Sequence, residues 1–292
     1  MRLIIIGGSG AVGHALATTA RQTGYQVIST ALRRASADDF IFDLSTQTLE
    51  ALVPDLGFDD CVYLFAAHIN PDWILAHPEQ SRQLNVAASL AALRYIQASG
   101  ARAVFLSTEL VFSGDTGAYT EQDPIAPSTK YAQYKAEVEA YIFQHCENTT
   151  IVRSGWVVTW RQQDHCPVLN TYRALLGDNA RMATDNQFTI TDVVDNTHIL
   201  LKLAKGGAHP LYHVVSEPVS SAQIAAWIMA DSGYQRDMHY QPIVFSELTF
   251  QEPRPSKPWM RNDRTRTEFQ HTFTTARDIV RRKTKLLDEW QN

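Results

Sequence analysis

The stretch IIIGGSGAVGHAL, residues 4–16, sets the beginning of the fold. It places three glycines at three-residue intervals, which are Gly7, Gly10 and Gly13. The apolar run Leu3–Ile6 precedes them, and apolar residues at helical spacing follow them up to Leu16. This order predicts a buried strand, a tight turn and a helix. Because glycine carries no Cβ, we expect the backbone of the turn to approach another group closely.

The remainder of the first half alternates short apolar runs with longer helical patterns. The runs predict strands at Leu3–Ile6, Tyr25–Thr30, Phe40–Phe42, Val62–Ala66, Ala103–Ser107 and Ile151–Val152. Between two of them, Glu79–Ser99 has apolar residues at helical spacing and stops at Gly100. Strands separated by helices favour parallel pairing with right-handed crossovers. The sequence therefore predicts an α/β fold with a doubly wound parallel sheet, the Rossmann architecture.

After Trp156 this alternation weakens, although residues 191–204 and 222–232 have helical patterns. We expect residues 1–153 to form a nucleotide-binding Rossmann domain, with a segment near 185–205 returning to it. Residues 154–292 should form mainly a smaller C-terminal substrate-binding region.

Composition limits the classes of function. The chain has 292 residues, 45% of them hydrophobic and 20% charged, which is typical of a soluble globular protein. A net charge of −5 favours neither nucleic acid nor a membrane surface as a partner. An apolar run of about 18 residues, as a membrane span needs, is absent from the sequence. Three widely spaced cysteines support neither disulfides nor a metal site, so we expect a cytoplasmic protein.

The glycine turn indicates a dinucleotide. Between a strand and a helix, its amides and the positive helix end can bind a pyrophosphate. NAD-binding proteins carry an acidic residue after the second strand, but VISTALRR (27–34) has none. Arg33 and Arg34 are suited instead to a 2′-phosphate, which favours NADP over NAD.

A second group of residues indicates acid–base chemistry. Tyr131 and Lys135 are four apart on a predicted helix and share one face. A phenol with a pKa near 10 is a weak acid at neutral pH. A cation about 4 Å away contributes roughly 4 kcal/mol at an effective dielectric near 20, so we expect Lys135, aided by an oxidised nicotinamide, to bring the pKa of Tyr131 within reach of pH 7. Thr108, at the end of the fifth strand, would hydrogen-bond the same substrate oxygen.

These motifs resemble the extended short-chain dehydrogenase/reductase family, closest to its dTDP-4-dehydrorhamnose reductase group. The resemblance lies in STELVFSGDTGAYTEQDPIAPSTKYAQYKAEVEAYI (107–142), LFAAHINPDW (64–73) and IVRSGWVV (151–158). It extends over nearly the whole chain. It implies a homodimer that reduces a nucleotide-linked 4-keto sugar, or a related small carbonyl compound, with NADPH.

The resemblance also implies roles for individual residues. The catalytic residues would be Thr108, Tyr131 and Lys135, with Tyr131 donating the proton. Cofactor contacts would come from Gly7, Gly10, Ala11, Val12, Gly13, Arg33, Arg34, Asp43, Leu44, Ala66, Ala67, His68, Asn85, Ser107, Tyr131 and Lys135. Substrate contacts would come from Thr108, Glu109, Trp156 and Arg254.

Some positions depart from the family pattern. Ala132 and Tyr134 replace the small residues inside the Tyr–Lys motif, and Leu110 replaces an aromatic residue. Leu110 also stands where related dehydratases have a second carboxylate, so dehydration is not expected. Two other functions remain open: a cofactor-binding regulatory subunit with weak catalysis, and a nucleotide-sugar epimerase.

Overall fold

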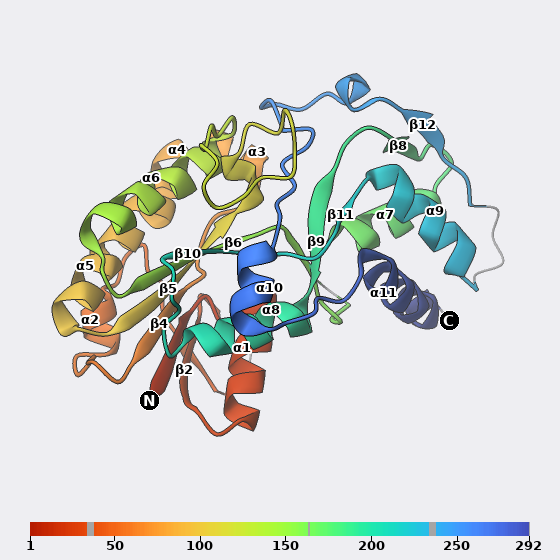
Figure 1. Cartoon of the computed structure of the whole chain (residues 1–292). Coiled ribbons are helices and arrows are strands. Elements are labelled where there is room, and N and C mark those ends of the chain that lie inside the picture. The colour runs from red at the N-terminus through yellow and green to blue at the C-terminus, as the bar shows by residue number, and fades with distance from the viewer. Residues whose placement is uncertain (34–37, 163, 234–237, 292) are drawn as a thin grey trace.

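The computed structural model describes residues 1–33, 38–162, 164–233 and 238–291. Its centre is a seven-stranded sheet in the order β10-β6-β5-β4-β1-β2-β3, in which every neighbouring pair is parallel (Figure 1). This confirms the predicted doubly wound α/β fold of the Rossmann type.

The strands of the sheet are β1 (Arg2–Ile6), β2 (Gln26–Ala31), β3 (Asp39–Ile41), β4 (Cys61–Leu64), β5 (Arg102–Thr108), β6 (Thr149–Ser154) and β10 (Leu211–Val214). The helices that flank it are α1 (Ala11–Gln22), α2 (Leu49–Leu52), α3 (Pro71–Ala76), α4 (Pro78–Arg82), α5 (Ser89–Ser99), α6 (Lys130–His145), α8 (Val193–Leu203) and α10 (Asp263–Phe269).

Each face of the sheet has its own hydrophobic core, because successive side chains of a strand point to opposite faces. In β1, Ile4 and Ile6 pack into the core shared with α5 and α6. Leu3 and Ile5 pack into the core shared with α1 and α8. Burial on both faces explains why these strands are continuously apolar, as parallel strands covered by helices usually are.

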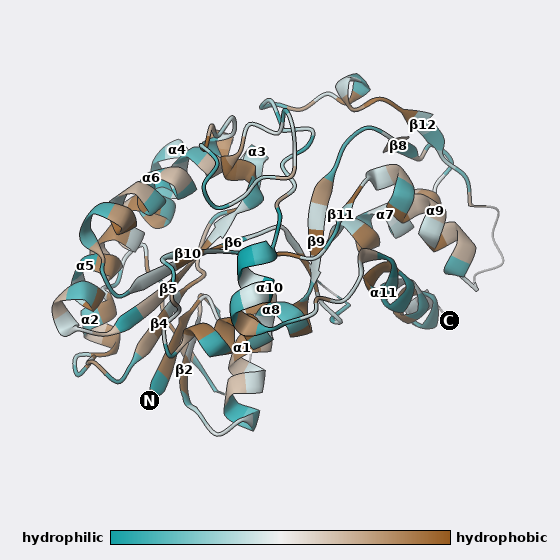
Figure 2. Cartoon of the chain, in the orientation of Figure 1, coloured by the Kyte–Doolittle hydropathy of each residue, from teal (hydrophilic) through white to brown (hydrophobic). Residues whose placement is uncertain are grey.

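A smaller lobe follows the sixth strand. It contains a sheet of β7 (Trp156–Val158), β9 (Phe188–Asp192) and β11 (Pro218–Val219), and the parallel pair β8 (Arg181–Ala183) and β12 (Gln241–Ile243). Its helices are α7 (Pro167–Leu175), α9 (Ser221–Asp231) and α11 (Ala276–Gln291), which enclose a separate core. Figure 2 shows hydrophobic residues along the central strands and a largely hydrophilic surface on α11.

Two features differ from the sequence-based expectations. The helix expected at Glu79–Ser99 begins at Pro78 and contains a π-helical segment, Gln83–Ala88. The segment near 185–205 was expected to return to the first domain, and helix α8 within it packs on α1. Strand β10 lies beyond that segment and also joins the large sheet. A segment after residue 153 thus completes the large sheet. The division of the chain into two domains at residue 153 stays a prediction. Among the described residues, no helix is long and apolar enough to cross a membrane.

A buried lysine fastens the C-terminal helix to the loop after β7. The Lys283 side chain is fully buried, and its ammonium donates to the carbonyls of Thr159 at 2.8 Å and Arg161 at 3.0 Å. The Trp290 ring lies 4.8 Å from the same nitrogen. Burial lowers the pKa of Lys283, so the carbonyls and the ring are what keep the cation inside the lobe.

Replacing this lysine should destabilise the lobe. Lys283→Met retains much of the side chain's volume but leaves two carbonyl groups without their donor, which should cost about 2 kcal/mol of unfolding free energy. Urea denaturation would measure the loss. Lys285→Met, at an exposed position on the same helix, is the control and should change stability little. Equal effects of the two substitutions would contradict this account of Lys283.

Candidate active site

The glycine turn between β1 and α1 is folded so tightly that side chains are excluded. Gly7 has a φ of +96°, and a Cβ there would lie 2.8 Å from the amide nitrogen of Ala66. A Cβ on Gly13 would lie 2.3 Å from the carbonyl oxygen of Gly7. Helix α1 therefore begins directly against the end of β1, next to the loop after β4.

The amino end of α1 has the properties of an anion site. Its N-cap is Gly10, which offers no side-chain hydrogen bond, and its first turn contains no acidic residue. Ala11, Val12 and Gly13 form this first turn. The amides of a first helical turn lack intrahelical partners, and the helix dipole favours negative charge there. The geometry fits a pyrophosphate.

A cavity of about 200 Å³ opens beside this turn, at the carboxyl ends of β1, β2 and β4. Seven of the residues expected to contact a cofactor line it: Gly7, Gly10, Asp43, Leu44, Ala66, Ala67 and His68. Because parallel strands end at the same edge of a sheet, residues that follow β1, β2, β3 and β4 meet here, and Leu84 adds a fifth segment to the lining.

Asn85 shapes the cavity wall through the backbone. Its side-chain oxygen accepts from the His68 amide at 2.8 Å, and its side-chain nitrogen donates to the His68 carbonyl at 2.9 Å. The His68 ring stacks on Trp73 with ring centroids 3.9 Å apart, and Trp73 stacks on His77 at 4.5 Å. The sequence reading missed this stack, although the four-residue spacing of Trp73 and His77 would have suggested that they share a helix face.

One of the two arginines that favour NADP lies among the described residues. Arg33 follows β2 and is exposed. Arg34 lies outside the described residues. Asp39 begins β3 opposite Ser29, and its carboxylate accepts from the Ser29 hydroxyl at 2.7 Å. This carboxylate is thus within the sheet and not at the end of β2, where a ribose would be recognised.

The end of β5 presents two hydroxyl groups. The Thr108 oxygen accepts from the Leu110 amide at 3.2 Å, which leaves the Thr108 hydroxyl proton free to donate. The Ser107 hydroxyl is buried and has no partner among the described residues. A buried hydroxyl without a partner is uncommon, and it fits a site completed by a ligand.

Lys135 fixes helix α6 to the end of β5. Its ammonium donates to the Leu106 carbonyl at 2.7 Å and lies 4.5 Å from the centre of the Phe105 ring. The same nitrogen is 5.8 Å from the centre of the Tyr131 ring. Burial lowers the pKa of Lys135 to about 8, against the opposing effect of Glu139. The lysine therefore titrates near physiological pH.

Lys135 alone does not produce the lowering of the Tyr131 pKa that was expected from the lysine together with an oxidised nicotinamide. Burial raises the pKa of Tyr131 above its usual 10, and Lys135 does not offset this. The reason is geometric. The Lys135 ammonium donates its hydrogen bond to the Leu106 carbonyl, and it lies 5.8 Å from the centre of the Tyr131 ring, which is beyond ordinary hydrogen-bonding distance. Tyr131 is a neutral phenol at physiological pH.

Glu109 joins the central sheet to the smaller lobe. The Thr189 amide donates to its Oε2 at 3.0 Å, and the Thr189 hydroxyl donates to the same oxygen. Burial raises the pKa of Glu109 to about 7 despite these two hydrogen bonds. The Glu109 side chain was expected to contact substrate. In the structure it is hydrogen-bonded to Thr189 in β9, and Glu109 directly follows Thr108 in the chain.

The two remaining substrate candidates come from segments after β6. Trp156 begins β7 and is 45% exposed. Arg254 is exposed in the loop before Trp259, with its guanidinium carbon 4.5 Å from the centre of the Phe250 ring. A guanidinium on an aromatic ring keeps its hydrogen-bond donors available.

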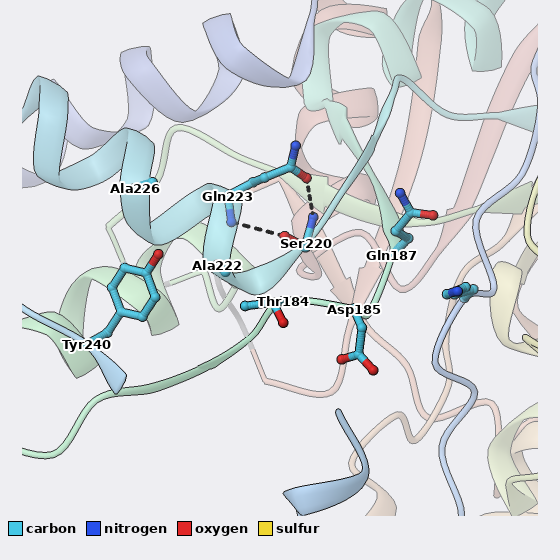
Figure 3. A pocket seen from close by; sticks show the side chains of 9 residues that line it. Thr184, Asp185, Gln187, Ser220, Ala222, Gln223, Ala226 and Tyr240 are labelled. Atoms are coloured by element: carbon cyan, nitrogen blue, oxygen red, sulfur yellow. Dashed lines mark hydrogen bonds between the residues drawn. The ribbon is translucent and has the colours of Figure 1, made fainter. Parts of the chain in front are cut away.

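A larger cavity of about 590 Å³ lies in the lobe, and polar residues predominate around it. Figure 3 shows Thr184, Asp185, Gln187, Ser220, Gln223 and Tyr240 around it. Ser220 and Gln223 bond one another at the start of α9. Lys257 also lines the cavity, and its amide donates to the carbonyl of Gly114, in the loop that follows β5. The described residues contain no group of three or more His, Cys, Asp or Glu that could hold a metal ion.

Comparison with known proteins agrees with this geometry. Residues 1–288 match the family described as the RmlD substrate binding domain. The chain belongs to this family.

The proteins to which it is similar have different names. It is 27% identical over 153 residues to methionine adenosyltransferase 2 subunit beta of Rattus norvegicus, and the match covers 52% of this chain. The match spans 46% of that relative, about half its length. The fold matches a dTDP-4-dehydrorhamnose reductase of Clostridium acetobutylicum with a TM-score of 0.84, 20% identity and coverage of 98% and 99% of the two chains. The fold also matches a dTDP-4-dehydrorhamnose reductase of Bacillus anthracis in complex with NADP, with a TM-score of 0.82 and 19% identity. This match covers 96% of this chain and 97% of the other.

Glu109 should make stability depend on pH. In the unfolded chain its carboxyl ionises near 4.5, whereas in the folded chain it keeps its proton up to about pH 7. The folded state therefore binds more protons in this window, and the unfolding free energy falls as pH rises through it.

Glu109→Gln should remove this dependence, because an amide oxygen can accept both Thr189 hydrogen bonds without becoming charged. Relative to the wild type, the variant should gain on the order of 2 kcal/mol between pH 4.5 and pH 8 in urea denaturation. Glu50→Gln, at an exposed position, should show no such gain. A constant difference between Glu109→Gln and the wild type across this range would contradict the assignment.

Proposed function

We propose that this protein is an NADPH-dependent reductase that acts on the keto group of a nucleotide-linked 4-keto sugar. The proposal depends above all on one observation: the buried Lys135 ammonium faces Tyr131 at the end of β5. This is the same sheet edge at which the glycine turn and the 200 Å³ cavity lie.

The residues around the cofactor cavity would hold NADPH. The amino end of α1 would bind the pyrophosphate, Asp43 and Leu44 would lie at the adenine, and Ala66, Ala67 and His68 would lie at the ribose. Ser107 and Lys135 would supply the donors nearest the nicotinamide. When bound, NADPH supplies a hydride to the carbonyl carbon of the substrate.

The chain's own groups would manage the proton. Thr108 donates a hydrogen bond that holds the carbonyl oxygen, and Tyr131 gives its phenolic proton to that oxygen as negative charge develops on it. Burial raises the pKa of Tyr131, so the phenol carries its proton at physiological pH but is a weak acid until charge develops on the substrate oxygen. The Lys135 ammonium then stabilises the phenolate that remains.

The larger cavity would receive the nucleotide part of the substrate. Lys257 lines it, and Arg254 lies in the same loop, so the diphosphate would meet two cations. Trp156 has an exposed ring that would pack on the sugar.

A second function has support from the match to methionine adenosyltransferase 2 subunit beta, which is named as a subunit and not as a reductase. A cofactor-binding regulatory subunit would have the same cavity with little turnover. A nucleotide-sugar epimerase would use the same three catalytic residues and retain its cofactor tightly.

Turnover distinguishes these functions. The purified protein is mixed with NADPH and with dTDP-, GDP- and UDP-linked 4-keto sugars, and the absorbance of the reduced cofactor is followed. Consumption of NADPH with one of them supports the reductase. Tight NADPH binding without turnover on any of them would favour the regulatory subunit.

Tyr131→Phe should then lower kcat by at least about 100-fold while the NADPH dissociation constant stays within about twofold, because only the proton donor is removed. Tyr134→Phe is the matched control, since this tyrosine is on the same helix and its hydroxyl makes only a 3.4 Å contact with the Pro78 carbonyl. Undiminished turnover in Tyr131→Phe would refute its assignment as the proton donor.

Arg33→Ala tests the choice of cofactor. If Arg33 binds the 2′-phosphate, the substitution should weaken NADPH binding by about tenfold and leave NADH binding unchanged. Titration of cofactor fluorescence gives both dissociation constants. Arg94→Ala, at an exposed position on α5, is the control. Equal NADPH and NADH affinities in the wild type would rule out the arginine argument.

A further inference from the structure

Helix α6 carries a third ionisable residue on the face that bears Tyr131 and Lys135. Glu139 follows Lys135 by four residues, as Lys135 follows Tyr131, so the three side chains lie along one face of the helix. Lys135 and Glu139 are both buried. The function proposed above gives Glu139 no role.

Glu139 is held in place by an arginine from the sheet. Arg153 in β6 donates from Nε to one carboxylate oxygen at 3.1 Å and from Nη2 to the other at 2.7 Å. The two side chains are 4% and 1% exposed. The guanidinium carbon also lies 5.0 Å from the centre of the Phe112 ring. The Glu139 carboxylate is therefore a fixed charge, out of reach of solvent.

Lys135 has little else to stabilise its charge. Within the described part of the chain, its ammonium makes one hydrogen bond, to the Leu106 carbonyl, and otherwise faces the rings of Phe105 and Tyr131. A cation in such surroundings loses its hydration and tends to give up its proton. A nearby carboxylate counteracts that tendency, and in a buried site the attraction is only weakly screened.

We propose that Glu139 and Arg153 are positioning residues for the candidate active site: the Glu139 carboxylate, anchored by Arg153, keeps Lys135 in its ammonium form at physiological pH.

The ionisable groups around Lys135 come from three elements. Tyr131 and Glu139 are on α6, and Arg153 is on β6. His213 on β10 lies behind Arg153 and stays neutral, because burial and the arginine lower its pKa to about 3. Glu139 is thus the one anion in this set, and burial places the pKa of Lys135 near 8 with Glu139 opposing a further fall.

The titration of Lys135 can be followed directly by NMR of the protein labelled with ¹³C at lysine Cε. Lys135→Met identifies the resonance by its disappearance. Glu139→Gln should lower the titration midpoint of Lys135 by about one pH unit, because the carboxylate no longer opposes the effect of burial and the Arg153 cation is left without its partner.

The double variant Glu139→Gln/Arg153→Met separates charge from structure. It removes both charges, so the Lys135 midpoint should fall between those of the wild type and Glu139→Gln. If Glu139 had a purely structural role, the Lys135 midpoints of the three proteins would not follow this order. If Glu139→Gln fails to fold, the double variant against the wild type still tests the direction of the shift, and circular dichroism checks the fold of each.

A Lys135 midpoint in folded Glu139→Gln that equals the wild-type value would overturn the proposal, as would a double variant that titrates lower than the single one. A second measurement rests on the proposed function: the pH above which NADPH affinity falls should move down by the same amount in Glu139→Gln. An NMR shift without a change in NADPH binding supports the role of Glu139 and refutes the assignment of Lys135 to the cofactor.

Discussion

The hydrogen bond from the Lys135 ammonium to the Leu106 carbonyl fixes the geometry on which the candidate active site depends. It attaches helix α6, which carries Tyr131, to β5, whose carboxyl end carries Thr108 at the sheet edge where the glycine turn also lies. A lysine can make such a bond in a buried place only if its charge is tolerated there. The packing of α6 against β5 and the electrostatics of the site therefore both depend on the charge of Lys135.

Close backbone contacts at the glycine turn support this arrangement from the sheet. Gly7 and Gly13 approach the chain so closely that a Cβ at either position would collide with backbone atoms. The cavity beside them is bounded by segments that are more than 50 residues apart in sequence, from Gly7 to Ala66. Its shape therefore follows from the strand order of the sheet, and side chains such as Asn85 refine it.

Sequence reasoning could predict what depends on local pattern. The strands up to β6 and the glycine turn were visible because buried parallel strands are continuously apolar and because turns need glycine. Strand β10 was not assigned, since Leu211–Val214 includes His213 and its burial is decided by contacts with β6 and α10. The burial that raises the pKa of Tyr131 in the protein alone could not be predicted, because spacing on a helix says nothing about where the Lys135 ammonium points. Glu109 was expected to contact substrate, and Glu139 is a polar residue on a predicted helix. Only the fold reveals their partners, Thr189 and Arg153.

The attachment of Glu109 to Thr189 has a mechanical consequence. Strand β9 contains Thr189, and the residue just before this strand, Gln187, lines the larger cavity. Glu109 in turn adjoins Thr108 in the chain. A short rigid path, of one strand and one carboxylate, therefore links the wall of the lobe cavity to the end of β5, so the lobe and the sheet cannot shift independently at this seam without breaking the two hydrogen bonds.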